Sequence, residues 1–155
     1  MERLNRGATY SRPLVLYARD VVEKDFLSLT ADSTVVEAAR AMKAQRRGFV
    51  LVGSPADPQG LVTEWDILSK VVAEGLDPEK ATLGQVMTTE LLSIDAGAGL
   101  AAVSQLMAEH GVRRLLVKDG GHIIGYITSR IMMARMNDYV DKVSTQISRL
   151  QAPWF

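Results

Sequence analysis

The sequence contains no cysteine and only two histidines among its 155 residues. The absence of cysteine excludes disulfide bonds, thiolate catalysis, and cysteine-ligated zinc or iron–sulfur sites. Neither His110 nor His122 has a second histidine or a carboxylate at metal-ligand spacing, so we expect no metal site. No P-loop, GxSxG motif or dinucleotide fingerprint occurs. We therefore expect a protein that is not an enzyme and has no catalytic residues.

Long apolar runs and an excess of charge of one sign are also missing. No run of about 18 apolar residues occurs, so we expect no membrane insertion. The first residues, MERLNRGATYSRP, lack the apolar stretch of a secretory signal, and the predicted location is the cytoplasm. The 18 basic and 18 acidic residues cancel, whereas proteins that bind phosphate backbones usually carry a basic excess. Nucleic acid is therefore disfavoured as the main partner.

The strongest positive feature is an internal repeat. A shift of 65 residues aligns residues 21–68 with residues 86–133 without a gap. Only two copies occur, which indicates a duplicated small domain rather than a solenoid. We predict an N-terminal extension (1–20), a first domain (21–75), a linker (76–85), a second domain (86–136), and a C-terminal helix extension with an aromatic tail (137–155). The matched pairs include Leu27 with Leu92, Ser28 with Ser93, Gly60 with Gly125, and Thr63 with Thr128.

Each copy is predicted to fold as strand, helix, strand, strand, helix. In the first copy, residues 32–34 can cap a helix that Glu37 supports in its first turn. In the second copy, Gly111 stands where a helix end favours a left-handed residue, and DGGH (119–122) predicts a tight hairpin. The predicted strands are 26–29, 49–52, 60–63, 91–94, 114–117 and 123–128, and the second helices begin at Glu64 and Ser129.

A short motif joins the last strand of each copy to its helix: GLVTEWD (60–66) and GYITSRI (125–131). This motif, the element order and the segment GVRRLLV (111–117) resemble the CBS domain, a family named after cystathionine β-synthase whose members occur in tandem. The resemblance covers about residues 15–134. It implies an α/β fold in which two CBS domains pack about a pseudo-twofold axis, with a C-terminal amphipathic helix beyond them.

Two interpretations of Asp66 remain open. Thr63 and Asp66 have the spacing of a capping box, in which the hydroxyl and the carboxylate bind each other's backbone N–H groups. The family resemblance implies instead that the Asp66 carboxylate accepts hydrogen bonds from the two hydroxyls of a ribose. Both roles can coexist.

The resemblance implies two clefts between the domains, of which one carries the complete motif. Its apolar residues would sandwich an adenine, and an arginine would bind phosphate, although a solvated strand edge is an equal alternative for the arginines. Core packing is an alternative for one of the two adjacent leucines. The residues expected in this nucleotide site are Leu61, Thr63, Asp66, Leu91, Leu92, Val112, Arg113 and Arg114.

The second cleft departs from the family pattern, because Ile131 stands where the ribose-binding aspartate is expected. Isoleucine cannot accept a hydrogen bond, so we expect this cleft to be empty, weaker, or specialised for a less hydroxylated ligand. Its expected residues are Phe26, Leu27, Arg47, Gly48, Phe49, Tyr126 and Thr128.

Beyond the repeat, apolar residues recur at alternating steps of three and four, which predicts a helix that packs on another helix. That helix could fold back on its own domain, or it could contact a second copy or another protein. The aromatic end, Pro153 to Phe155, suits an anchor in a neighbouring groove. The residues of the apolar seam are Met133, Met136, Val140, Val143, Ile147 and Leu150.

The resemblance implies a regulatory sensor of an adenosine-containing ligand: AMP, ADP, ATP or S-adenosylmethionine. It also implies a homodimer, because family members commonly assemble as flat discs. The ligand would act by changing the activity of an effector protein that the sequence does not identify. The alternative is an oligomerisation or interaction module without a ligand, and nucleic-acid binding is a third, less favoured function.

Overall fold

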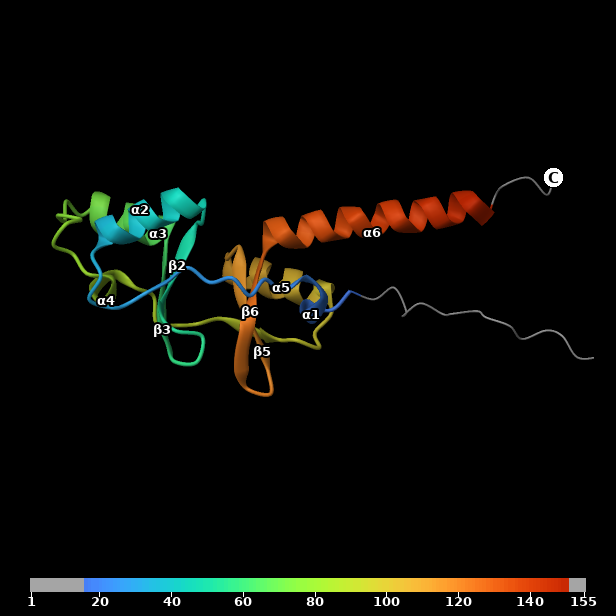
Figure 1. Cartoon of the computed structure of the whole chain (residues 1–155), viewed down its shortest axis with the longest axis horizontal. Coiled ribbons are helices and arrows are strands. Elements are labelled where there is room, and N and C mark those ends of the chain that lie inside the picture. The colour runs from blue at the N-terminus through green and yellow to red at the C-terminus, as the bar shows by residue number, and fades with distance from the viewer. Residues whose placement is uncertain (1–15, 151–155) are drawn as a thin grey trace, which may run out of the picture.

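The computed structural model describes residues 16–150 and has an α/β fold with two three-stranded sheets (Figure 1). The aromatic tail and most of the N-terminal extension lie outside the described residues. In the first sheet, β1 (Ser28–Leu29) runs parallel to β2 (Phe49–Gly53), which pairs antiparallel with β3 (Pro58–Thr63). The second sheet repeats this order and these directions with β4 (Ser93–Asp95), β5 (Arg114–Asp119) and β6 (His122–Thr128). The predicted duplication and fold class are confirmed.

Local signals in the sequence set the ends of the helices. In α2 (Val35–Gln45), the Thr34 backbone N–H donates to the Glu37 carboxylate at 2.7 Å, and the Glu37 N–H donates to the Thr34 hydroxyl at 3.3 Å. In the second half, α5 (Leu100–His110) ends at Gly111 with φ 62°, in the left-handed region that glycine favours. The helix predicted after β3 is a short α3 (Glu64–Asp66) that continues into a π-helical stretch, η1 (Ile67–Val72).

Two short segments cross from one half to the other. Helix α1 (Ala18–Val21) comes before the first sheet in the chain, but Ala18 and Val21 are buried in the core of the second half. Conversely, α4 (Leu83–Val86) comes before the second sheet, but Leu83 is fully buried in the core of the first half. Part of the predicted linker therefore completes a hydrophobic core, and the two halves are interlocked.

The glycine of each motif allows these segments to pass. A Cβ atom at Gly125 would overlap the carbonyl oxygen of Glu23, and a Cβ atom at Gly60 would lie 2.9 Å from the carbonyl oxygen of Thr88. At the crossing points, Glu23 pairs with Tyr126 and Leu61 pairs with Thr88 in isolated antiparallel bridges. Glycine is needed here because the crossing backbone lies directly against the strand.

The last helix, α6 (Ser129–Leu150), is 22 residues long and extends away from the second half (Figure 1). Met132 near its start is buried, whereas Met133, Met136, Val140 and Ile147 are exposed. Of the two alternatives left open for this helix, the structure does not show folding back on its own domain, since Met136, Val140 and Ile147 stay exposed. Among the described helices, none is both long and apolar enough to cross a membrane.

The crossing of α4 generates a stability prediction. Leu83→Ala should lower the free energy of unfolding by about 3 kcal/mol, because it leaves a cavity in the first-half core. The matched control is Leu76→Ala, since Leu76 is 48% exposed and its truncation should cost less than about 1 kcal/mol. Urea unfolding followed by circular dichroism measures both. Equal costs for the two variants would show that the segment is only a linker.

Candidate functional site

A pocket with a volume of about 550 Å³ lies between the two halves. Its first-half wall is the turn between α2 and β2 together with the start of α3. Its second-half wall is the start of β5, the end of β6 and the first turn of α6. The lining residues are Glu23, Arg46, Arg47, Gly48, Phe49, Glu64, Arg113, Arg114, Tyr126, Thr128, Ser129, Arg130 and Ile131.

The repeat explains why these residues meet. With the shift of 65, Gly48 and Phe49 correspond to Arg113 and Arg114, and Glu64 corresponds to Ser129. Equivalent positions of the two copies therefore face each other across one pocket. The two arginines predicted for the first cleft line the same space as five residues predicted for the second: Arg47, Gly48, Phe49, Tyr126 and Thr128.

The pocket is rich in positive charge. Five arginines line it (Arg46, Arg47, Arg113, Arg114 and Arg130), against two glutamates (Glu23 and Glu64). The planar guanidinium group offers paired donors that match the oxygens of a phosphate or a carboxylate. The arrangement suits an anionic ligand.

Arg114 packs across the boundary between the two halves. It donates to the carbonyl oxygen of Gly48 at 3.2 Å, and its guanidinium carbon lies 5.1 Å from the ring centroid of Phe49. Burial lowers the pKa of Arg114, and the Glu64 carboxylate opposes that shift. Its buried Nε has no hydrogen-bond acceptor within residues 16–150. An acceptor that entered the pocket could satisfy this donor.

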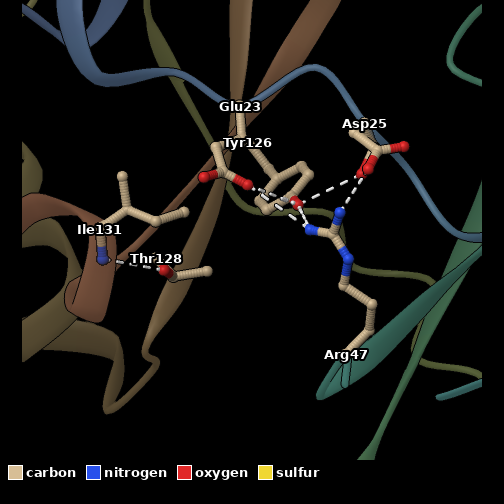
Figure 2. A network of polar contacts seen from close by, with 6 residues as sticks. All are labelled: Glu23, Asp25, Arg47, Tyr126, Thr128 and Ile131. Carbon is tan, nitrogen blue, oxygen red and sulfur yellow. Dashed lines mark hydrogen bonds and ion pairs between the residues drawn. The ribbon is translucent and has the colours of Figure 1, made fainter. Parts of the chain in front are cut away.

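Arg47 is held in a network of polar contacts (Figure 2). It donates to the Tyr126 hydroxyl and forms ion pairs with Glu23 and Asp25. The Tyr126 hydroxyl lies 3.1 Å from the Glu23 carboxylate, to which it can donate. Burial raises the pKa of Tyr126 to about 12, although the Arg47 charge acts in the opposite direction. Tyr126 is therefore a neutral hydrogen-bond donor near neutral pH.

The network and its aromatic neighbours form part of the wall of the predicted second cleft. The Tyr126 ring centroid lies 5.1 Å from that of Phe26 and 4.9 Å from that of Phe49. Thr128 accepts a hydrogen bond from the Ile131 backbone N–H at 3.2 Å, so its hydroxyl caps α6 (Figure 2). Leu27 differs from the prediction, because it packs in the first-half core.

Asp66 is 5% exposed and is not among the residues that line the pocket. One carboxylate oxygen accepts from the backbone N–H and the hydroxyl of Thr63, both at 2.8 Å. The other oxygen lies 2.8 Å from the Lys70 ammonium and accepts from the Thr88 hydroxyl at 3.1 Å. The capping interpretation of Asp66 is confirmed, since its N–H donates back to the Thr63 hydroxyl at 3.2 Å.

These contacts determine the charge of Asp66. Burial would raise the pKa of the carboxyl, but hydrogen bonds from Lys70 and Thr63 outweigh it, and the pKa lies below its ordinary value. A carboxylate has about four acceptor positions, and the four contacts use all of them. A further donor would have to replace one of the present partners.

The apolar residues predicted for the first cleft separate into two groups. Leu61 and Leu91 pack in a small cluster between the sheets with Phe49, Leu116 and Tyr126. Leu92 and Val112 pack against the second-half core. Leu91 and Leu92 lie directly before β4, and the two neighbouring side chains pack in different clusters.

Sequence reasoning missed several residues around the site. Glu23, Arg46, Glu64, Ser129 and Arg130 line the pocket, and Lys70 and Thr88 surround Asp66. The register of the repeat could have indicated Glu64 and Ser129, which directly follow the two motif threonines. Glu23 and Thr88 required knowledge of the crossing segments. Within residues 16–150, no group of three or more histidine, aspartate or glutamate side chains could hold a metal ion.

The chain matches the family model "CBS domain" twice, over residues 18–73 and 83–138. A similar relative is the CBS domain-containing protein YhcV of Bacillus subtilis, which is 31% identical over 109 residues, or 70% of this chain and 77% of that protein. A hexameric CBS-CP12 protein from bloom-forming cyanobacteria is 28% identical with a TM-score of 0.69, over 78% of this chain and 68% of that one.

The CBS domain protein PAE2072 from Pyrobaculum aerophilum, solved as a complex with AMP, has a TM-score of 0.66 over 75% of this chain and 89% of that one. At 21% identity this likeness shows the fold. The two matches to the family model cover most of the chain and coincide with the two interlocked halves. The chain therefore belongs to the CBS-domain family and contains a tandem pair of CBS domains.

Proposed function

We propose that this protein is a non-catalytic sensor of an adenosine-containing ligand such as AMP, ADP, ATP or S-adenosylmethionine. The observation that carries the proposal is the convergence of five arginines from both halves on one pocket. The complex of PAE2072 with AMP supports the ligand class, since that protein has the same fold. We place the protein in the cytoplasm, as the sequence predicts.

In this proposal Arg113 and Arg114 bind phosphate. The Arg113 side chain is exposed and forms no ion pair among the described residues, so an incoming anion meets no competing carboxylate on it. The buried Nε of Arg114 lies in the same wall and lacks an acceptor within residues 16–150. A phosphate that bridges them would satisfy this donor.

The nucleoside would lie next to the cluster between the sheets, with Leu61 and Leu91 against the adenine. At one Asp66 oxygen, the ribose hydroxyls would replace the Lys70 ammonium or the Thr88 hydroxyl. The other Asp66 oxygen would keep its hydrogen bonds from Thr63. Because the Asp66 carboxylate is buried, the ribose hydroxyls would have to replace the lost partner directly.

Ligand binding would then bias the relative orientation of the two halves, because both contribute to one pocket. A ligand shifts this equilibrium only by the difference in its affinity for the two arrangements. An effector protein would respond to the favoured arrangement.

The second candidate is an oligomerisation or interaction module without a ligand. The network of Arg47, Tyr126, Glu23 and Asp25 favours it, since the protein's own side chains occupy one side of the pocket. The complete set of partners on Asp66 also favours it. Nucleic-acid binding remains the least favoured function, because the arginine cluster is local and the whole chain carries no net charge.

We also propose a homodimer. Trp65, Leu68 and Val72 on α3 and η1 are 69%, 52% and 65% exposed, and an apolar group of this kind suits a protein contact. The hexameric assembly of the CBS-CP12 protein supports self-association in a related chain.

The phosphate contact predicts a selective loss of affinity. Arg113→Ala should weaken AMP binding by about tenfold or more, the equivalent of one charge-assisted hydrogen bond of about 1.5–3 kcal/mol. Binding of adenosine, which has no phosphate, should not change. Isothermal titration calorimetry measures both, with Arg40→Ala on the exposed face of α2 as the charge-matched control.

Two outcomes would contradict this assignment. An equal loss for adenosine and AMP would mean that Arg113 does not bind phosphate. A panel of adenosine ligands that leaves the melting temperature unchanged would favour the module without a ligand, since a ligand at 100 times its dissociation constant adds about 2.7 kcal/mol.

The ribose contact predicts that Asp66→Ala lowers the affinity only for ligands whose ribose carries the 2′ and 3′ hydroxyls. The wild-type protein should bind AMP about tenfold or more tightly than 2′,3′-dideoxy-AMP, and Asp66→Ala should remove this preference. Lys70→Met is the matched control, because it frees the Asp66 oxygen and should keep or increase the preference for AMP. If Asp66→Ala lowers only the melting temperature while the ratio of the two affinities persists, the residue is purely a helix cap.

A further inference from the structure

The C-terminal part of α6 has an apolar face that nothing in the described chain covers. Val140 is 60% exposed, Met133 is 55% exposed and Ile147 is 48% exposed. A shallow groove follows this face, with Tyr139 and Ser144 on its two edges. The uncovered face is defined here as the α6 seam: Met133, Met136, Val140, Val143 and Ile147.

The spacing of the seam indicates the shape of its partner. The steps are three, four, three and four residues, which keep one narrow stripe on one side of a helix. A stripe of this width matches a second helix with the same repeat, whereas a helix that packs on a sheet usually has a broader apolar face. The partner that fits is therefore a helix.

The distribution of charged residues on α6 indicates which helix can be its partner. No charged residue lies in the seam, and the rows beside it carry uncharged side chains such as Asn137, Tyr139, Ser144 and Gln146. The charged side chains after Met133 fall on the other rows, and they are Arg135, Asp138, Asp141, Lys142 and Arg149. Two copies of this seam can meet without like charges in contact, and a self-complementary surface is what a twofold interface requires.

The low stability expected for α6 as an isolated helix also favours a partner on its seam. From Met133 to its end, α6 would extend about 27 Å at 1.5 Å per residue, beyond the domain that supports its first turn. This stretch contains two valines, an isoleucine, a threonine, two serines and an asparagine, all weak helix formers. An isolated helix of this length and composition is marginal in water, so burial of the seam is needed to stabilise it.

We propose that α6 of one chain pairs along its seam with α6 of a second copy of this chain. The contact is independent of nucleotide binding, because none of the seam residues lines the pocket between the halves. It is also separate from the exposed surface of Trp65, Leu68 and Val72 on the first half. It would join the second halves of two chains through a short two-helix coiled coil.

Sedimentation over a range of concentrations tests the pairing in the full chain carrying Leu68→Asp, which disables the other proposed contact. Val140→Asp combined with Ile147→Asp should raise the dissociation constant of self-association at least about a hundredfold, because two charges enter the apolar contact. The matched control is Thr145→Asp on the opposite side of the helix, where Arg149 four residues later can pair with the new carboxylate. A cooperative unfolding transition and unchanged AMP binding would show that the double variant still folds.

Cysteine cross-linking provides a second readout, and the absence of native cysteine makes it specific. A disulfide-linked dimer of Val140→Cys alone indicates parallel pairing. A disulfide between one Val140→Cys chain and one Val143→Cys chain, formed only when the two variants are mixed, indicates antiparallel pairing. Either product supports the proposal, and Thr145→Cys should form none.

A wild-type chain that sediments as a monomer would overturn the proposal, and so would self-association that the two aspartates leave unchanged. Absence of both cross-links would have the same meaning. Each of these results leaves the nucleotide titrations unaffected, so the pairing of α6 and the proposed sensor function can fail separately.

Discussion

The exchange of short segments between the two halves is the constraint on which the rest of the structure depends. Helix α1 closes the second hydrophobic core, and the segment from Ala81 to Val86 closes the first. Each exchange needs a strand that another backbone can approach closely, which is why glycine stands at positions 60 and 125. Neither half has a complete core by itself, so the two sheets are held face to face.

This interlock creates the pocket. The turns that carry Arg47 and Arg113 occupy equivalent positions in the repeat, and the exchange brings both to one space. Several cations in a confined space repel one another unless acids or a ligand compensate. Glu23 and Asp25 on the crossing segment neutralise Arg47, whereas Arg113 has no acidic partner within residues 16–150. Arg46 and Arg130 also form no ion pair among these residues, so positive charge is left uncompensated on both walls of the pocket.

The two halves have diverged around the same framework. Asp66 and Ile131 occupy equivalent positions, and both backbone N–H groups are capped by the preceding threonine hydroxyl. The threonine half of the cap does not require the carboxylate. What Asp66 adds is the reciprocal hydrogen bonds from Thr63, the ion pair with Lys70 and the contact with Thr88. This asymmetry agrees with the proposed function, in which only the Asp66 side binds a ribose.

The sequence alone determined the duplication, the order of strands and helices, the helix caps and the family. These features depend on residues within one copy: Thr34 and Glu37 lie one helical turn apart, and Gly120 and Gly121 adopt the positive φ values of 56° and 83° that a tight hairpin needs. Tertiary structure decided the partition of Leu91 and Leu92 between two clusters, the placement of Arg113 and Arg114 beside residues of the second predicted cleft, and the partners of Asp66. They depend on Glu23 and Thr88 crossing between the halves, and no local pattern of spacing or polarity encodes a contact between residues so far apart in the chain.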